Sequence, residues 1–188
     1  MSIRIIEIKD QYIDFLKNYF FSTMMDNKPG RRIHSRKYIG ILLTINNYNY
    51  FAPLSSPKDS DYMEDGTIRN SSKVILRMVA NSTTQPKLLG TIKLNNMIPV
   101  PKSEIIDYDI SLESDTKYRD LLLDELKWIQ RNTERIKKSA NKLYNIKIKE
   151  ELNRNDSNSK FYDSIMPFLE AEVKCDEYTN LNKNRNVK

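Results

Sequence analysis

The strongest constraint on the fold is a predicted β-hairpin in the first third of the chain. Two apolar runs, 38–45 and 50–54, flank the asparagine-rich segment 46–49. Runs of this length around a turn of this composition are typical of two antiparallel strands joined by a tight turn. The other expectations for this chain are organised around that hairpin.

Antiparallel pairing determines which residues meet at the open end of the hairpin. With the turn centred on 46–47, residue 36 faces residue 57, to within a residue or two. The end of a strand can hold a loop that carries chemistry on a rigid support. A loop of solvated charges is the alternative interpretation. The side chains that the pairing brings together are Arg36, Lys37, Ser55, Ser56 and Lys58.

The net charge of +6 is concentrated in the middle of the chain. Residues 27–103 carry twelve basic and four acidic residues (+8), and the remainder carries nineteen basic and twenty-one acidic residues (−2). Interleaved aromatic residues suit a polyanion with bases to stack on, namely RNA or single-stranded nucleic acid. A basic surface that only confers solubility is the alternative. The predicted RNA-binding residues are Arg31, Arg32, Lys37, Lys73, Arg77, Lys87 and Lys93.

The length and the cysteine content limit the possible domain organisations. The 188 residues suit one domain, predicted at 1–172, with a frayed C-terminal tail at 173–188. The single cysteine, Cys175, excludes an internal disulfide and a cysteine-based zinc site. No apolar run has the length of a signal peptide or a membrane span, so a cytoplasmic location is expected.

The remaining elements are predicted from periodicity. Strands are expected at 3–8, 74–79 and 88–94, and a helix is expected after Asp10. Segment 95–101 contains two prolines and should lie at an edge or bend.

The second half of the chain is predicted to be helical. Apolar residues recur at steps of three and four over 115–152, which indicates a long helix near 115–139 that covers the sheet. A short element interrupted by Pro167 is expected at 161–169.

Several catalytic classes are excluded by what the sequence lacks. One histidine rules out a pair of histidines acting as acid and base within one chain. The basic region has no metal-binding motif, no clustered carboxylates and no glycine-rich phosphate loop, which argues against metal hydrolysis and nucleotide triphosphate use. No cofactor is therefore expected. Cleavage of RNA by its own 2′-hydroxyl remains, because it needs only positioning, charge stabilisation and proton movement.

The residues at the hairpin end can supply these functions. Lys58 or Arg36 can stabilise charge on the phosphorane, and Ser56 can hold the 2′-hydroxyl or a phosphate oxygen. His34 can move a proton if it points inward, and a structural or exposed histidine is the alternative.

Three segments of the sequence also carry a resemblance. KYIGILLTINNYNYFAPLSSPK, LGTIKLNNMIPVP and YRDLLLDELKWIQRNTERI occur in this order over residues 36–136 and resemble the ToxN/AbiQ family of type III toxin–antitoxin and phage-abortive systems. The resemblance implies an α+β fold: a compact, twisted, antiparallel β-barrel-like sheet covered by helices, similar to the MazF and Kid toxins. It also implies a metal-independent endoribonuclease toxin, inhibited by a repeated pseudoknot RNA in a ring-like assembly.

By position, the resemblance implies that Ser56 is the central active-site serine and that Ser55 and Lys58 flank it. Arg36 falls where family members have a lysine, and Arg32 falls where one has a tyrosine. An arginine holds its proton far more strongly than a lysine, so Arg36 suits a charge clamp, and proton transfer passes to Lys58 or His34.

The function predicted from the sequence is RNA cleavage that leaves a 2′,3′-cyclic phosphate and a 5′-hydroxyl. Cellular or phage RNA is the expected substrate, and the alternative is a noncatalytic RNA-binding regulator that uses the same basic sheet.

Overall fold

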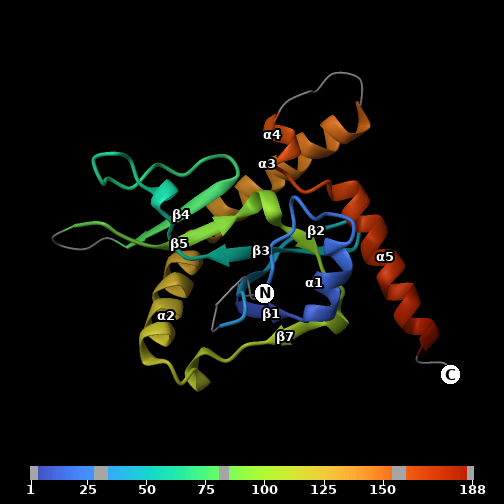
Figure 1. Cartoon of the computed structure of the whole chain (residues 1–188), viewed down its shortest axis with the longest axis horizontal. Coiled ribbons are helices and arrows are strands. Elements are labelled where there is room, and N and C mark those ends of the chain that lie inside the picture. Colours follow the sequence, from blue (N-terminus) through green and yellow to red (C-terminus); the bar gives the residue numbers. More distant parts are fainter. Residues whose placement is uncertain (1–3, 28–33, 81–84, 154–159, 186–188) are drawn as a thin grey trace.

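The computed structural model describes residues 4–27, 34–80, 85–153 and 160–185. Among these described residues, seven antiparallel strands form the sheet: β1 Ile5–Ile8, β2 Tyr38–Ile45, β3 Tyr48–Ser55, β4 Ile75–Ala80, β5 Lys87–Lys93, β6 Ile98–Pro99 and β7 Ile105–Asp107. Their order is β4–β5–β3–β2–β1–β7, with β6 also paired to β3 (Figure 1). β3 is therefore the central strand, because one of its edges pairs with β2 and the other with β6 and then β5.

The sheet is open. Within the described residues, its outer strands β4 and β7 pair only with β5 and β1, and not with each other. The α+β class with an antiparallel sheet is thus confirmed, but the sheet does not close as a barrel. The likeness to the MazF and Kid toxins stays a prediction.

In the described ranges, five α-helices lie around the sheet: α1 Asp10–Lys17, α2 Thr116–Arg131, α3 Thr133–Leu152, α4 Lys160–Asp163 and α5 Phe168–Arg185. α2 packs on β4 and β5, α3 packs on β2, and α5 packs on β6 and α1. Figure 1 shows α2 and α5 on opposite sides of the strands. The apolar faces of sheet and helices form one buried cluster. No helix in the described part of the chain has the length and apolar character needed to cross a membrane.

The predicted hairpin is present, and its turn lies where the sequence indicates. Asn46 and Asn47 both have positive φ, 50° and 70°, as the two central residues of a type I′ turn require. Next to the turn, Ile45 pairs with Tyr48, as predicted. Asparagine tolerates this backbone region better than most residues, which explains why this turn could be predicted.

The register at the open end of the hairpin differs from the prediction by two residues. Tyr38 pairs with Pro53 instead of residue 55, because the ladder shifts between Ile39 and Leu43. Three residues of β2 there oppose one residue of β3, which is an irregularity of the β-bulge kind. Gly40 lies in this bulge, and its N–H donates to the Arg4 carbonyl at 2.7 Å. Directly before the bulge, Tyr38 and Ile39 pair with β1 on the other edge of β2.

The long helix predicted near 115–139 is two helices. α2 ends at Arg131 and α3 begins at Thr133, with Asn132 at φ −110° and ψ 14° between them. The Thr133 hydroxyl donates to the carbonyls of Ile129 (3.1 Å) and Gln130 (3.0 Å). Side chains of this kind compete for helix carbonyls and bend or end the helix. The apolar stripe continues through the break, so periodicity alone could not reveal it.

The C-terminal tail predicted to be frayed is mostly an ordered helix. α5 extends to Arg185, and Cys175 and Tyr178 on it are buried. Its first N–H groups, at Phe168 and Leu169, donate to the Glu151 carboxylate at 2.7 and 2.9 Å, which caps the helix. Residues 186–188 of the predicted tail lie outside the described part.

A buried carboxylate joins α5 to the central strand. Glu172 Oε1 accepts hydrogen bonds from the hydroxyls of Tyr50 on β3 (2.6 Å) and Tyr144 on α3 (2.8 Å). Burial, followed by the bond to Glu172, raises the pKa of Tyr50 and of Tyr144, so both hydroxyls remain donors. This contact could not be predicted from the polar sequence of α5, because the tyrosines that bind Glu172 come from distant parts of the chain.

Candidate active site

The candidate site begins where β3 ends. Ser55, its last residue, is buried, whereas Ser56 and Lys58 in the following turn are exposed. Ser55 pairs with Thr91 on β5, and the Thr91 hydroxyl lies 3.4 Å from the Ser55 carbonyl. The two exposed side chains are therefore presented from a rigid strand end.

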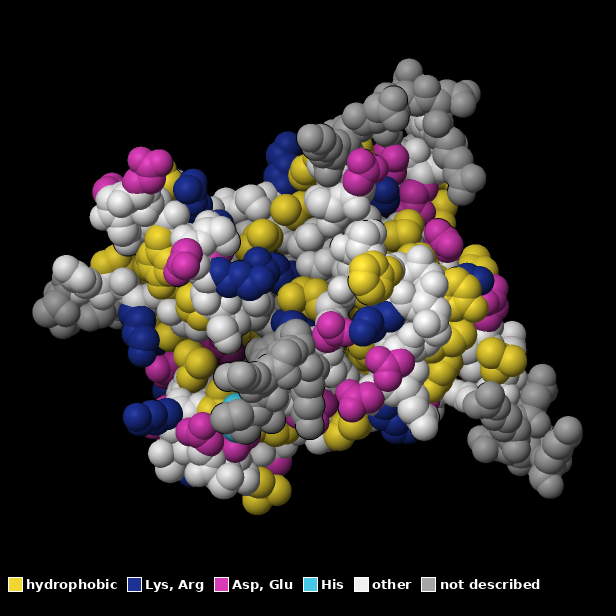
Figure 2. Space-filling model, in the orientation of Figure 1, with side chains coloured by type: hydrophobic (Ala, Val, Ile, Leu, Met, Phe, Trp, Pro, Cys, Tyr) yellow, Lys and Arg dark blue, Asp and Glu magenta, His cyan; other side chains and the backbone are white. Residues whose placement is uncertain are grey.

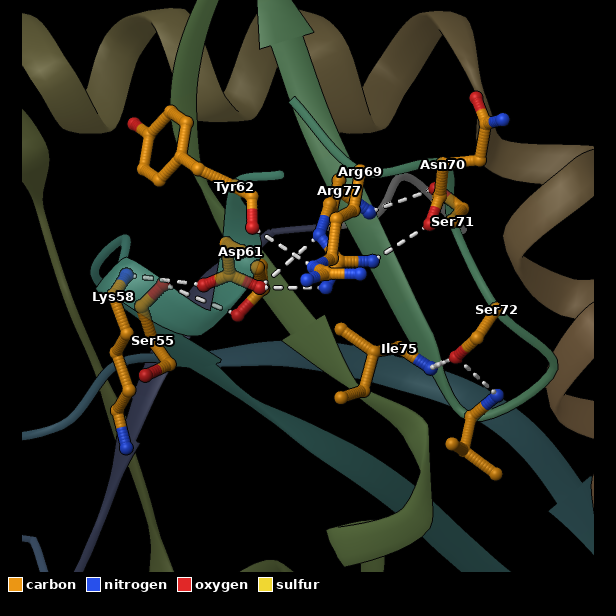
Figure 3. A network of polar contacts seen from close by, with 12 residues as sticks. Ser55, Lys58, Asp61, Tyr62, Arg69, Asn70, Ser71, Ser72, Ile75 and Arg77 are labelled. Carbon is orange, nitrogen blue, oxygen red and sulfur yellow. Dashed lines mark hydrogen bonds and ion pairs between the residues drawn. The ribbon is translucent and has the colours of Figure 1, made fainter. Parts of the chain in front are cut away.

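Asp61 fixes the turn that carries Ser56 and Lys58. Its carboxylate accepts from the Lys58 backbone N–H at 3.0 Å and from the Nε and Nη2 atoms of Arg77 at 3.1 and 2.8 Å (Figure 3). Asp61 is only 2% exposed. Arg77 also donates to the Asn70 carbonyl at 2.7 Å, which ties the next loop to β4. A buried ion pair thus holds the turn and the loop together.

Arg36 lies beside the end of β3, as the hairpin prediction required. Its Nη1 donates to the Leu54 carbonyl at 2.9 Å and its Nε to the Asp26 carbonyl at 2.8 Å. The side chain is 4% exposed. In this arrangement Arg36 braces the strand that presents Ser55 and brings positive charge to the site from below the surface.

By strand register, Lys93 lies on the same face of the sheet as Ser55 and Arg77, level with Pro53 of β3. Directly opposite residues in an antiparallel ladder share a face. Thr91 is opposite both Ser55 and Arg77, so all three face the same way, and Lys93 follows two residues later on that face. Figure 2 shows basic side chains gathered near the middle of the molecular face that carries β3 and β5.

Burial lowers the pKa of the half-buried Lys93 ammonium. The nearby cations Lys58, Arg77 and Arg36 lower it further, whereas Asp61 raises it. Lys93, which was predicted from the sequence as an RNA contact, therefore lies close enough to these charged side chains to feel their fields.

Lys37 lines the same small hollow as Ser55 and Ser56 and is only 3% exposed. Its ammonium pairs with Glu7 and lies 3.8 Å from the centre of the Tyr108 ring. The prediction that Lys37 binds RNA does not fit this burial. The same holds for Arg77, whose guanidinium is occupied by Asp61 and whose side chain is 9% exposed.

His34 lies to one side of the serines. Its ring stacks on Tyr118 at 3.9 Å, and its nitrogens lie 3.4 Å from Asp115 and 3.7 Å from Glu113. The Tyr118 backbone N–H, more than His34, lowers the pKa of Asp115. Tyr118 lines the small hollow that includes Ser55 and Ser56, whereas His34 does not line it.

The other predicted RNA contacts are spread along the chain. Lys73 and Lys87 are exposed, before β4 and at the start of β5. Arg31 and Arg32 lie outside the described residues.

A groove of about 840 Å³ runs beside β4, adjacent to the Asp61–Arg77 pair. The loop 67–71 lines one side, and the end of α2 and the start of α3 line the other. Among the described residues that line it, Asp124 is the single acidic side chain, and it pairs with Lys127 at 3.3 Å. The aromatic and basic side chains that line it are Arg69, Arg77, Lys127, Trp128, Arg131 and Arg135. The sequence analysis missed this site, because a pattern of basic residues does not show that a loop and two helices enclose them.

In the ranges that the structure describes, no three acidic, histidine or cysteine side chains lie close enough together to hold a metal ion.

Comparison with known proteins gives concordant results. The family model described as "Toxin ToxN, type III toxin-antitoxin system" matches residues 4–174. The chain is similar to Endoribonuclease ToxN of Bacillus thuringiensis subsp. kurstaki, with 31% identity over 91% of this chain and 81% of that protein. It is similar to Endoribonuclease AbiQ of Lactococcus lactis subsp. lactis, with 27% identity over 77% of this chain and 75% of that protein.

Solved structures show the same likeness. One, from a study of selective toxin inhibition by a non-coding RNA pseudoknot, has a TM-score of 0.75 and 28% identity, covering 95% of this chain and 99% of that one. The AbiQ structure, at 22% identity, shares the fold with a TM-score of 0.71 over 96% of this chain and 99% of that one. Because the family model spans most of its length, this chain belongs to the ToxN family of type III toxin–antitoxin toxins.

Proposed function

We propose that this protein is a metal-independent endoribonuclease toxin that cleaves RNA through attack of the 2′-hydroxyl on the neighbouring phosphorus. The products carry a 2′,3′-cyclic phosphate and a 5′-hydroxyl. The relatives named as endoribonucleases ToxN and AbiQ support the RNase activity. The cleavage chemistry rests on the side chains at the end of β3.

One observation carries the proposal: exposed hydroxyl and ammonium groups project from a strand end that buried cations hold in place. Ser56 and Lys58 are exposed, and Arg36 and Arg77 fix the strand and the turn beneath them. Ser56 orients the 2′-hydroxyl or a phosphate oxygen, and Lys58 stabilises the charge that develops on the phosphorane. The substrate provides the nucleophile, so charge and position suffice for catalysis.

We infer that the partners are an inhibitory pseudoknot RNA and cellular or phage transcripts. A structure at 28% identity comes from work on inhibition of a toxin by such an RNA. A ring-like assembly with a repeated antitoxin RNA and a cytoplasmic site of action belong to the same proposal. The groove beside β4 suits a single-stranded part of either RNA, because cations track the phosphates and Trp128 offers a stacking surface.

Removing two groove cations should weaken RNA binding and reduce its salt dependence. The variant Arg131→Ala/Arg135→Ala is expected to lower the slope of log K against log salt by about 1–2, since each lost phosphate contact contributes roughly 0.7–0.9. Titration of RNA at several salt concentrations measures this. The matched control is Lys142→Ala/Lys149→Ala, which removes equal charge from exposed positions farther along α3. An equal loss in both variants would show a general charge effect and remove the groove from the interface.

Incubating the purified protein with RNA in EDTA separates the enzyme from a noncatalytic RNA-binding regulator. An enzyme of the proposed type cuts RNA as fast with the chelator as without it. A binding module shifts RNA in a gel but leaves every transcript whole. Cleavage that stops in EDTA and returns with a divalent cation would instead show a metal-dependent nuclease.

A further inference from the structure

We propose that the groove beside β4 holds the RNA strand that flanks the scissile linkage, and that stacking of one flanking base on Trp128 raises the rate of cleavage. The inference rests on the proposed endoribonuclease function and deepens it, because it names what the substrate must contain besides the linkage that is cut. It follows from two walls that the groove shares with the serines, namely one helix and one loop.

Helix α2 is the first shared wall. Tyr118 and Leu121, in its first half, line the hollow that includes the two serines. Trp128, in its second half, lines the groove. Trp128 follows Leu121 by two helical turns, about 10 Å along the helix axis. A few stacked nucleotides, at roughly 3.4 Å each, span this distance. A strand held at Ser56 therefore reaches Trp128 within a few nucleotides.

The loop 67–71 is the second shared wall, and Asp61 joins it to the turn at Lys58 (Figure 3). The Asp61 carboxylate accepts from the Lys58 backbone N–H, and the Asp61 carbonyl accepts from the backbone N–H of Arg69 at 2.9 Å. Arg69 Nε also donates to the Tyr62 carbonyl at 2.8 Å. The groove wall and the turn are therefore one hydrogen-bonded unit, so RNA fixed at one is held in register with the other.

The side chains that line the groove suit a single strand of RNA. Arg131 and Arg135 are exposed on its helical wall and can contact phosphates. Trp128 is partly buried and packs against the core, so its indole is held in place for a base to stack on. Asn132 Nδ2 donates to the Trp128 carbonyl at 2.8 Å and braces this end of α2. Because the bases of a duplex already stack on one another, this contact favours an unpaired flank.

The shared walls explain why the contact should act on the rate and not only on binding. Binding energy from a remote part of a substrate can hold the reacting group in its productive position. A flank anchored at Trp128 limits the positions that the scissile linkage can adopt beside Ser56 and Lys58. An RNA without this anchor should be cut slowly even when all of it is bound.

The test removes single bases from the flanks of an RNA of constant length. A linkage that the wild-type protein cuts is first located by sequencing the product ends. Each nucleotide on either side is then replaced in turn by an abasic nucleotide, which keeps the phosphate and removes the base. Single-turnover cleavage at saturating protein is measured for each RNA. We expect one sensitive position, a few nucleotides from the linkage and on one side only, where the rate falls by about 5–150-fold, the usual effect of losing one stacked base.

Trp128→Ala should slow cleavage of the natural RNA by the same factor. Abasic replacement at the sensitive position should then have little further effect, because the base and the ring are the two partners of one contact. Trp128→Phe keeps an aromatic face and should recover much of the rate. Thermal unfolding verifies that the variants are folded, and Trp128→Leu, which keeps apolar packing without a ring, replaces Trp128→Ala if alanine unfolds the protein. Phe21→Ala removes an aromatic ring that is 84% exposed on the turn after α1, and this control should match the wild type on every RNA.

Three outcomes would overturn the proposal. A scan without a sensitive flanking position would show that no flanking base contributes to the rate. A sensitive position that keeps its full effect in Trp128→Ala would assign the base contact to another residue. A loss confined to affinity, with the rate at saturating protein unchanged, would make the groove a binding surface that does not set the register. If the wild-type protein cuts no RNA, the proposed function itself fails, and that result is distinct from these three.

Discussion

Ser56→Ala should abolish growth arrest and slow RNA cleavage by about 10²–10³-fold, the cost of losing one oriented hydrogen-bonding group at a reacting phosphate. RNA binding should be largely kept, because the cations that contact phosphates are unchanged. Ser56 is exposed, so the substitution opens no cavity in the core. Single-turnover cleavage of a saturating amount of RNA measures the chemical step separately from binding.

Ser60→Ala is the matched control for Ser56→Ala. Ser60 is an exposed serine in the same turn region, and its loss should leave cleavage near the wild-type rate. If Ser56→Ala lost affinity and toxicity in parallel, Ser56 would be a contact that positions RNA, and the proposed catalytic role would be wrong.

Asp61→Ala should lower the free energy of unfolding by about 3–5 kcal/mol, the usual cost of leaving one partner of a buried ion pair without its counter-charge. Asp61 is 2% exposed and the Arg77 side chain 9%, so water compensates the loss poorly. The turn that carries Ser56 and Lys58 also loses its acceptor at the Lys58 N–H, and cleavage should fall with stability. Urea-induced unfolding measures the first effect.

Two further variants test the Asp61 interpretation. Asp59→Ala, at an exposed carboxylate two residues earlier, should change stability by less than about 0.5 kcal/mol. Asp61→Leu/Arg77→Met removes both charges and should recover much of the stability lost in Asp61→Ala, because no buried charge is left without a partner. A double variant as unstable as the single one would show that the ion pair is not what holds this loop.

Local signals in the sequence were enough to predict the hairpin. Two asparagines with positive φ mark its turn, and the apolar runs beside them mark its strands. The register at its open end could not be predicted, because the bulge around Gly40 depends on pairing with β1, far away in the sequence. Arg36 still reaches the end of β3, since its long side chain tolerates a shift of two residues.

Charge alone could not distinguish buried cations that support the site from cations that are exposed to solvent. Lys37 and Arg77 are as basic as Lys73 and Lys87, yet the first two are held inside by Glu7 and Asp61. These acids are distant in sequence from the lysine and arginine that they pair with. Glu172 is likewise distant in sequence from its partners, Tyr50 and Tyr144. Their hydrogen bonds hold α5 against the core, although the sequence of this segment resembles a polar tail.

The central claim is that the RNA supplies the nucleophile for its own cleavage. The direct test is an RNA in which the single 2′-hydroxyl next to the mapped cleavage site is replaced by hydrogen, incubated with the purified protein. This linkage should stay intact, while neighbouring natural linkages remain susceptible and give 2′,3′-cyclic phosphate ends. Cleavage of the 2′-deoxy linkage at the normal rate would show that water is the nucleophile, and the proposed mechanism would be wrong.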